Sequence, residues 1–528
     1  MHPWIQPIAR VLGFNPVAWL RNSLRMQSDV AAFLRRHPVA GIQTPRVLAV
    51  ITPWQGSSVP WYTLAIAVLL AARGCQVSFV LDDFRFGDKP WRFAFVLRCL
   101  RVVMRQLQGR FEVLVLSSQA QLSDSANPPS PLVHDLARMN TTWHLRGEII
   151  EAGRQQYAQQ CLRQIGRADQ PIARLISGGT YEVLLVPGGV FGTSGLWVAH
   201  ARANGMRVCS FDAAGYGVAM FASNGVASQL QDIPEAFRKL KTQGSPAEHE
   251  FAHDSALAEM AKRRQGVDAF SSQIVGAKGG DARHDGAVLI ALNSSWDAAA
   301  LGLHTVFSDN AEWIIKTVRY VLEQTSTNVI VRQHPVERLQ LGWTSDDYRA
   351  LLQRHFGDEP RLHFIAAADS INSYALLARV GMVVTYTSTI GIEAAAHGKP
   401  VVSPSRAYYA GLGFVWKAGD LASYQALLLA GAAGQLRVSP QMRADAHLCY
   451  YLTQCCNWFP SPFNPSDFAD WSSIGLDELH ADAKINVAMT ALASGTPLAN
   501  LNHQQKFAES HAAGPLQPTQ TDTALTTP

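Results

Sequence analysis

The stretch VVTYTSTIGIEAAAHGKPVV, residues 383–402, contains a complete strand–helix–strand unit. An apolar strand runs into a turn of hydroxyl residues, and an alanine-rich helix follows the turn. Gly398 ends this helix, because glycine readily adopts the left-handed conformation that closes a helix. A second apolar strand begins after Pro400. The stretch therefore predicts an α/β fold in which helices connect the strands of a sheet.

Two series of such units run along the chain. The first begins at RVLAVI (46–51) and ends with MRVCSF (206–211), whereas the second begins at AVLIAL (287–292) and ends with PVVS (400–403). Short continuous apolar strands that alternate with helices are typical of parallel sheets covered on both faces. We therefore predict two Rossmann-like lobes whose parallel sheets face each other across a cleft.

Changes in composition predict the boundaries of these lobes. We expect a basic and aromatic helical extension over residues 1–44, a first lobe over 45–240 and a second lobe over 286–494. Polar residues dominate between the lobes, so residues 241–285 are predicted to be a linker. Residues 495–528 are polar, rich in Ala and Pro and aperiodic, and we predict that this tail is disordered.

The extension at residues 1–44 combines basic and aromatic side chains with a single acid, Asp29. Its basic and aromatic residues are Arg10, Arg21, Arg25, Arg35, Arg36, Trp4, Phe14, Trp19 and Phe33. This combination is typical of a helix that lies on an anionic membrane surface. The alternative is a helix that packs on the protein and keeps its arginines in water.

The composition excludes some classes of function. The net charge of +4 is small for 528 residues, so it gives no reason to expect nucleic acid binding. The seven cysteines show no C-x-x-C spacing, and we expect reduced thiols. We find no signal-peptide pattern, and the longest apolar run, Thr63 to Ala72, is too short to cross a bilayer. We expect a cytoplasmic protein, either soluble or peripheral on the inner face of the membrane.

Ligands of parallel α/β sheets bind beyond the carboxyl ends of the strands, so polar residues at those positions are the candidates for a site. Thr387, Ser388 and Thr389 cluster before the helix of the opening stretch, where free backbone amides attract anions. Gly391 allows close approach of a ligand, and Glu393 can accept hydrogen bonds from ribose hydroxyls. The alternative is a capped helix with Glu393 in a capping box, which explains the hydroxyls but not the pair of Gly391 and Glu393.

Two other strand ends of the second lobe carry polar residues. Ser294 and Ser295, in the segment NSSWD, can bind a phosphate oxygen, although Ser and Asn are also ordinary turn and N-cap residues. Arg332 and His334 end the strand of VIVRQHP. A guanidinium fork and an imidazole two residues apart form a compact pair of donors for a phosphate or diphosphate.

The first lobe supplies candidates for the other side of the cleft. Asp212 follows the strand MRVCSF and is the candidate acid or base. Asp82 and Asp83 follow QVSFVL, and Ser57 and Ser58 follow the first strand, so these four are candidates for acceptor contacts. Each carboxylate can instead cap a turn, and the serines can belong to a plain loop. Asp82-Asp83 is not a spaced D-x-D motif, and we expect no metal site.

A family resemblance joins the motifs of the second lobe. TSTIGIEAAAHGKPVV resembles the signature of the bacterial capsule polysaccharide biosynthesis family, which includes retaining β-Kdo transferases that use CMP-Kdo. The resemblance spans about residues 287–415, from NSSWDAAALG to SRAYYAGLGF, and extends weakly to residues 184–215. It implies a GT-B fold, no metal requirement, and donor phosphate contacts from His334, Ser388 and Thr389.

The resulting hypothesis is a metal-independent glycosyltransferase of capsular or other surface polysaccharide biosynthesis. A nucleotide sugar such as CMP-Kdo would be the donor, a glycan or glycolipid would be the acceptor, and no cofactor would be needed. His334 would stabilise the departing phosphate, and Asp212 would manage the acceptor proton. The alternatives are a nucleotide-sugar epimerase or a polyol-phosphate transferase of the same fold, and a non-catalytic glycan-binding subunit of an assembly complex.

Overall fold

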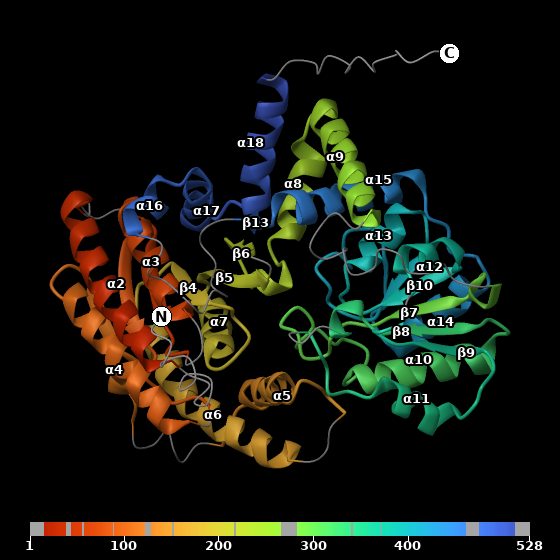
Figure 1. Ribbon diagram of the computed structural model, residues 1–528, viewed down its shortest axis with the longest axis horizontal. Helices are drawn as coiled ribbons and strands as arrows, with labels where there is room; N and C mark the ends of the chain where they lie inside the picture. Colours follow the sequence, from red (N-terminus) through yellow and green to blue (C-terminus); the bar gives the residue numbers. More distant parts are fainter. Residues whose placement is uncertain are drawn as a thin grey trace, which may run out of the picture.

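Short aliphatic strands form two separate sheets, one in each lobe of the computed structural model (Figure 1). Strands β1, β2, β5 and β7 begin within one residue of the apolar runs that predict them. The structure describes residues 15–38, 44–54, 58–87, 89–121, 128–149, 153–215, 218–265, 282–338, 342–369, 371–460 and 475–512.

The sheet of the N-terminal lobe has seven strands in the order β13-β6-β5-β4-β1-β2-β3. These strands are β1 (Arg46–Ile51), β2 (Gln76–Leu81), β3 (Glu112–Val115), β4 (Val183–Pro187), β5 (Arg207–Gly215), β6 (Val218–Ala222) and β13 (Phe459–Pro460). The first five are mutually parallel, as predicted. The sheet is mixed at one edge, because β6 is antiparallel to β5 and β13 is antiparallel to β6.

Helices cover both faces of this sheet, which explains why its strands are almost uniformly apolar. One face is covered by α2 (Pro16–Arg36), α3 (Val59–Ala71), α4 (Pro90–Leu107), α16 (Leu476–Ala481) and α17 (Ala483–Ser494). The other face is covered by α5 (Pro131–Leu145), α6 (Arg154–Gly178) and α7 (Ser194–Ala203). Helix α3 is apolar all round because it lies between the sheet and α2, α16 and α17.

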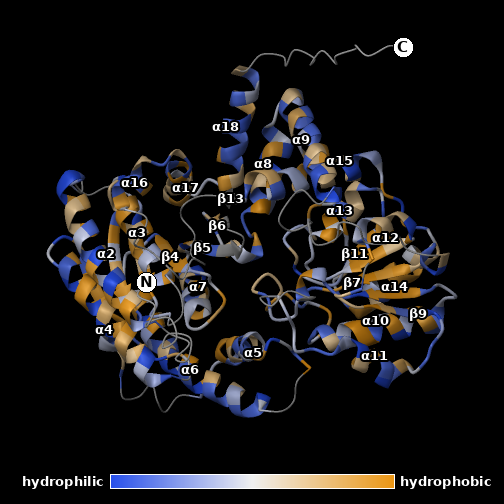
Figure 2. Ribbon diagram, in the orientation of Figure 1, coloured by the Kyte–Doolittle hydropathy of each residue, from blue (hydrophilic) through white to orange (hydrophobic). Residues whose placement is uncertain are grey.

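The sheet of the C-terminal lobe has six parallel strands in the order β12-β11-β10-β7-β8-β9. They are β7 (Val288–Ala291), β8 (Val329–Arg332), β9 (Leu362–Ile365), β10 (Met382–Thr385), β11 (Val401–Ser403) and β12 (Trp416–Lys417). One face carries α10 (Asn310–Gln324), α11 (Tyr348–Phe356) and α14 (Leu421–Ala432). The other carries α8 (Ile233–Gln243), α9 (Pro246–Arg264), α12 (Ser373–Arg379), α13 (Ile390–Ala396) and α15 (Pro440–Tyr450). Figure 2 shows the hydrophobic residues gathered in the strands and in the helix faces beside them.

Three predicted boundaries need correction. The predicted linker 241–285 contains helix α9, whose start is fixed by a capping box between Ser245 and Glu248. Residues 266–281 of that linker lie outside the described residues. The second lobe does not extend to residue 494, because α16 and α17 return to the N-terminal lobe and bury Leu479 and Ile485 in its core.

The predicted disordered tail, residues 495–528, begins instead with helix α18 (Leu498–Ala512). Leu498 and Ala499 are buried, and Asn500 and His503 are buried polar residues of the same helix. The helix is weakly amphipathic, so composition alone gave little sign of it. Residues 513–528 lie outside the described residues.

The N-terminal extension is a helix that packs on the protein, at least over residues 16–36. Trp19 and Phe33, which the sequence offered as membrane-facing aromatics, are buried in the core of the lobe. Trp4, Phe14 and Arg10 lie outside the described residues.

The seven cysteines are free thiols, as expected, and six of them are buried. Within the described ranges, no helix is both long and apolar enough to span a bilayer.

Candidate functional site

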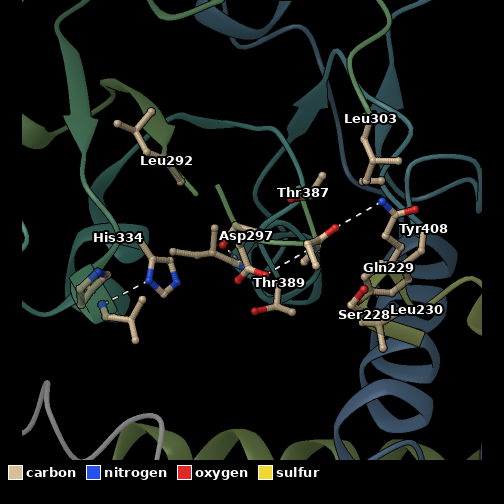
Figure 3. Close-up of a pocket in the computed structure, with 18 of the residues that line it drawn as sticks. Ser228, Gln229, Leu230, Leu292, Asp297, Leu303, His334, Thr387, Thr389 and Tyr408 are labelled. Carbon is tan, nitrogen blue, oxygen red and sulfur yellow. Dashed lines mark hydrogen bonds between the residues drawn. The ribbon is translucent and has the colours of Figure 1, made fainter. Parts of the chain in front are cut away.

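A cavity of about 490 Å³ lies between the two lobes. Its walls include the residues that follow β7, β8 and β10 in the C-terminal lobe, together with Asp212 of β5 and the 3₁₀ turn η3 (Ala227–Gln229) in the N-terminal lobe. Helix α9 and the π-helical turn η7 (Tyr451–Cys456) also contribute. In Figure 3, His334 lies at one end of the pocket and Ser228, Gln229 and Leu230 lie at the other.

The turn that follows β10 is the most compact polar part of this wall. Thr387, Ser388 and Thr389 all line the pocket, as the sequence predicts. Asn293, at the end of β7, donates from its Nδ2 to Thr387 Oγ1 at 2.7 Å and accepts from the Thr387 backbone amide at 3.1 Å. Thr389 is the N-cap of α13 but makes no side-chain capping bond, so its hydroxyl remains available to a ligand. Asn293 thus holds the turn in place from a neighbouring strand.

Gly391 and Glu393 have surroundings that the sequence did not predict. A Cβ on Gly391 would lie 2.8 Å from the Tyr409 hydroxyl, so this glycine permits packing inside the lobe and does not line the pocket. Glu393 does line the pocket, but its Oε1 lies 3.4 Å from Arg263 Nη1 and accepts from the Tyr374 hydroxyl at 3.3 Å. Its carboxylate therefore takes part in an ion pair and not in the capping box considered as the alternative.

Arg332 and His334 both line the pocket, at the end of β8. The two terminal nitrogens of Arg332 donate to the backbone carbonyls of Ala366 and Ile371, so the guanidinium braces the loop after β9. Burial, together with the charge of Arg332, lowers the pKa of His334 to about 4, and the imidazole is neutral at pH 7. Its Nδ1 accepts the Val336 amide at 3.2 Å, which leaves Nε2 to carry the proton.

Ser294 and Ser295 point to a buried carboxylate cluster and not to an open phosphate site. Ser294 Oγ lies 3.4 Å from Glu337 Oε1, and Ser295 Oγ donates to Asp346 Oδ2 at 2.5 Å. Both serines are buried, and neither lines the pocket. Burial raises the pKa of Glu337 to about 8, and the neighbouring Asp346 also contributes to this rise. Glu337 is therefore largely protonated at pH 7 and can remain buried without an ion pair.

Asp346 also ties the two lobes together, which the sequence did not suggest. Its carboxylate accepts the backbone amides of Glu148 at 3.1 Å and Ile149 at 2.8 Å, in the segment that follows α5. Beside this contact the Arg146 guanidinium lies 3.8 Å from the ring centre of Trp296, which lines the pocket. We call the contact between residues 146–149 and Asp346 the interlobe clasp.

Of the candidates in the N-terminal lobe that the structure describes, only Asp212 lines the pocket, where it is half-buried. It lies within β5, which continues to Gly215, and does not follow the strand as predicted. Asp82 is fully buried and accepts from Thr193 Oγ1 at 2.5 Å and Trp197 Nε1 at 2.9 Å, so it fixes the start of α7. Burial raises the pKa of Asp82 to about 6. Asp83 accepts from the amide and hydroxyl of Ser117 at 2.8 and 2.7 Å.

The structure does not support a role in acceptor binding for the two serines proposed from the sequence. Ser58 is buried as the N-cap of α3 and does not line the pocket. Ser57 lies outside the described residues.

The sequence missed much of the pocket wall, including the polar residues Ser228, Gln229 and Arg263. Ser228 and Gln229 come from η3, which follows the antiparallel strand β6 that the sequence did not reveal. Gln229 Nε2 donates to Leu301 O of the other lobe at 2.9 Å. Arg263 comes from α9, inside the predicted linker, where Lys262 and Arg264 flank it and nothing in the local sequence distinguishes it from them. Across the described residues, no group of three or more His, Cys, Asp or Glu side chains is arranged to hold a metal ion.

Residues 271–428 match a family model described as capsule polysaccharide biosynthesis protein. This range contains residues 287–415, over which the sequence motifs resemble that family, so the resemblance is confirmed there. The match does not reach residues 184–215, where the weaker resemblance stays a prediction. No curated protein matches the chain.

Several solved structures are similar at low identity. KpsC of Thermosulfurimonas dismutans matches as a β-Kdo 2,4 transferase, with 13% identity over 51% of this chain and 79% of that chain and a TM-score of 0.33. The β-Kdo 2,7 transferase of the same KpsC has 18% identity over 54% and 89%, with a TM-score of 0.31. MurG of Acinetobacter baumannii has 12% identity over 77% and 95%, with a TM-score of 0.25. The fold follows from strand order and direction, and two Rossmann-like lobes with a pocket between them are the GT-B arrangement.

Proposed function

We propose that this protein is a glycosyltransferase of capsular or other surface polysaccharide biosynthesis that binds a nucleotide-sugar donor in the interlobe pocket. The observation that carries the proposal is that the polar ends of β8 and β10 open into the same pocket as Asp212 of the opposite lobe. A donor bound to one lobe and an acceptor bound to the other would meet there. The family match over residues 271–428 supports surface polysaccharide synthesis as the context.

The donor phosphate would bind on the C-terminal side of the pocket. The neutral imidazole of His334 offers Nε2–H as a donor to a phosphate oxygen, and the hydroxyls of Ser388 and Thr389 offer two more. Arg332 would add positive charge from behind while it holds the loop after β9. Together these groups would stabilise charge on the leaving phosphate, so we propose that transfer needs no metal ion.

The acceptor would approach from the N-terminal side. Asp212 is half-buried within β5 and would accept the proton of the attacking hydroxyl. Glu393 would reach a ribose only if its contacts with Arg263 and Tyr374 rearrange. We propose Kdo, carried as CMP-Kdo, as the sugar, because the motifs of the second lobe resemble a family that includes Kdo transferases, and residues 271–428 match the capsule polysaccharide biosynthesis model. Contact of residues 1–44 with a membrane stays a prediction.

A thermal-shift panel of CMP, UDP, GDP and CDP, each with and without Mg²⁺, tests the proposal. We expect CMP to raise Tm by several degrees in both conditions, because the proposed phosphate contacts are all side chains of the protein. His334→Ala should lose this stabilisation, and His355→Ala, on the exposed side of α11, should keep it.

Each other outcome has a definite meaning. Selective stabilisation by UDP or GDP would overturn the CMP-Kdo assignment and leave a glycosyltransferase, and selective stabilisation by CDP would favour the polyol-phosphate transferase. Turnover of a nucleotide sugar in the absence of any acceptor would favour an epimerase. No stabilisation by any nucleotide would overturn the proposal as a whole.

A further inference from the structure

Helices α2 and α4 form one continuous surface at the outer edge of the N-terminal lobe, on the side away from the C-terminal lobe (Figure 1). Ser23 Oγ donates to the Cys99 carbonyl at 3.1 Å, and Gln106 Nε2 donates to Gln27 Oε1 at 3.1 Å. These contacts fix the two helices side by side. We call their exposed side chains the α2–α4 face.

This face is unusually apolar for an outer surface. Of the nine large hydrophobic residues that are exposed in the described chain, five lie on these two helices. On α2, Val17, Leu20 and Leu24 are 50%, 53% and 59% exposed. Their spacing of three and four residues places them on one side of the helix. On α4, Trp91 and Val102 are 48% and 41% exposed. Isolated exposed apolar residues are ordinary, but a cluster on adjacent helices indicates a docking surface.

Helices α2 and α4 are strongly basic. Together they contain eight arginines and a single acid, Asp29, which lies 4.0 Å from Arg25. Arg25, Arg98 and Arg105 are exposed in the same surface. Figure 2 shows hydrophilic and hydrophobic residues mixed along both helices. Leucines in the acyl boundary and arginines at the headgroups are the arrangement of an interfacial helix on anionic lipid.

We propose that the α2–α4 face docks on an anionic lipid surface, with Leu20 and Leu24 inserted at the level of the acyl boundary and with Arg25, Arg98 and Arg105 paired with lipid phosphates. This differs from the arrangement expected from sequence, because Trp19 and Phe33 are buried and α4 supplies half of the surface. A lipid surface fits better than an acidic protein groove, because the exposed apolar residues are spread over the outer sides of two helices and alternate with exposed arginines. The face lies on the lobe proposed to bind the acceptor, and docking would bring that lobe to a glycolipid.

Vesicle co-sedimentation tests the docking without donor or acceptor, so its result is independent of the proposed reaction. The full chain should sediment with vesicles of phosphatidylglycerol and phosphatidylcholine, and pure phosphatidylcholine should retain little of it. Leu20→Glu with Leu24→Glu should abolish sedimentation. The matched control is Leu421→Glu with Leu429→Glu on α14, a similarly exposed pair on the other lobe, which should bind as the wild type does.

A second variant tests the charges. Arg25→Gln, Arg98→Gln and Arg105→Gln together should weaken binding to the anionic vesicles on the order of 100-fold. All variants should keep the Tm of the wild type, because the substituted side chains are exposed. Equal sedimentation of the two leucine double variants would overturn the proposal. So would a wild type that forms a dimer, becomes monomeric with Leu20→Glu and Leu24→Glu, and fails to bind vesicles, since the face would then be an interface between copies.

Discussion

The hydroxyl of Ser228 is buried, lines the pocket and has no hydrogen-bond partner among the described residues. A buried hydroxyl without a partner costs free energy unless a ligand satisfies it. We therefore expect Ser228→Ala to leave Tm unchanged or slightly raised while the rate of glycosyl transfer falls about five- to tenfold. Melting curves and initial rates at low substrate concentration measure the two effects.

Ser194 provides the matched control for this residue. Its hydroxyl is also buried without a partner in the described part of the chain, but it begins α7 and does not line the pocket. Ser194→Ala should affect Tm as Ser228→Ala does and leave the rate unchanged. If the two alanine variants have the same rate, Ser228 does not contact a substrate.

For single residues, the sequence predicted which side chains lie at the pocket better than it predicted what they contact. Thr387, Thr389 and His334 line the pocket because each follows a parallel strand of one sheet, and the strand-end rule depends only on local pattern. The partners of Glu393 and Ser295 are Arg263 and Asp346, which are distant in sequence. The predicted ligand contacts of Glu393 and Ser295 are therefore replaced by contacts within the protein, which only the folded chain reveals.

At the scale of elements, the interlobe clasp depends on a glycine. A Cβ on Gly147 would collide with the Asp346 carboxylate, which receives the amides of Glu148 and Ile149. We expect Gly147→Ala to lower the free energy of unfolding by about 1–3 kcal/mol, because the carboxylate must move away from the amides it accepts. Urea unfolding followed by circular dichroism measures the change.

Gly178, the last residue of α6, is the control for this substitution. It is exposed, and an added Cβ would meet nothing within 4 Å. Gly178→Ala should therefore be neutral or stabilise the protein by up to about 1 kcal/mol. A loss of stability of the same size in both variants would show that Gly147 matters for backbone flexibility and not for the clasp.

The predictability of an element followed its length and its apolar pattern. Strands β1, β2 and β7 were predicted almost to the residue, because each is a short apolar run buried by helices on both faces. Strand β13 has two residues and pairs with β6, which is distant in sequence, so it carries no local signal. Helix α9 is polar on much of its surface, and its composition is that of a linker.

At the scale of the whole molecule, the chain crosses between the lobes more often than two consecutive domains would require. It enters the C-terminal lobe through α8 and α9, and α16 and α17 bring it back to the N-terminal lobe (Figure 1). The sequence predicted the two lobes from two runs of strands. It could not predict this return, because no property of the 475–512 segment shows which lobe it contacts.

Helix α18 contacts both lobes, so we expect it to couple them. Leu498 at its start is buried in the core of the N-terminal lobe. One turn later His503 bonds the Tyr451 hydroxyl at 3.0 Å and Glu248 at 3.2 Å, both of which belong to elements packed on the C-terminal lobe. Because His503 is buried, His503→Ala leaves the Tyr451 hydroxyl without its ring partner and opens a cavity.

We expect His503→Ala to lower the free energy of unfolding by about 2–4 kcal/mol and to separate the calorimetric transition into two, as the lobes lose their coupling. Gln505→Ala, two residues along on the exposed side of the helix, should stay within about 0.5 kcal/mol of the wild type and keep a single transition. Differential scanning calorimetry distinguishes these results. A single unshifted transition for His503→Ala would mean that the clasp and the interlobe pocket couple the lobes without α18.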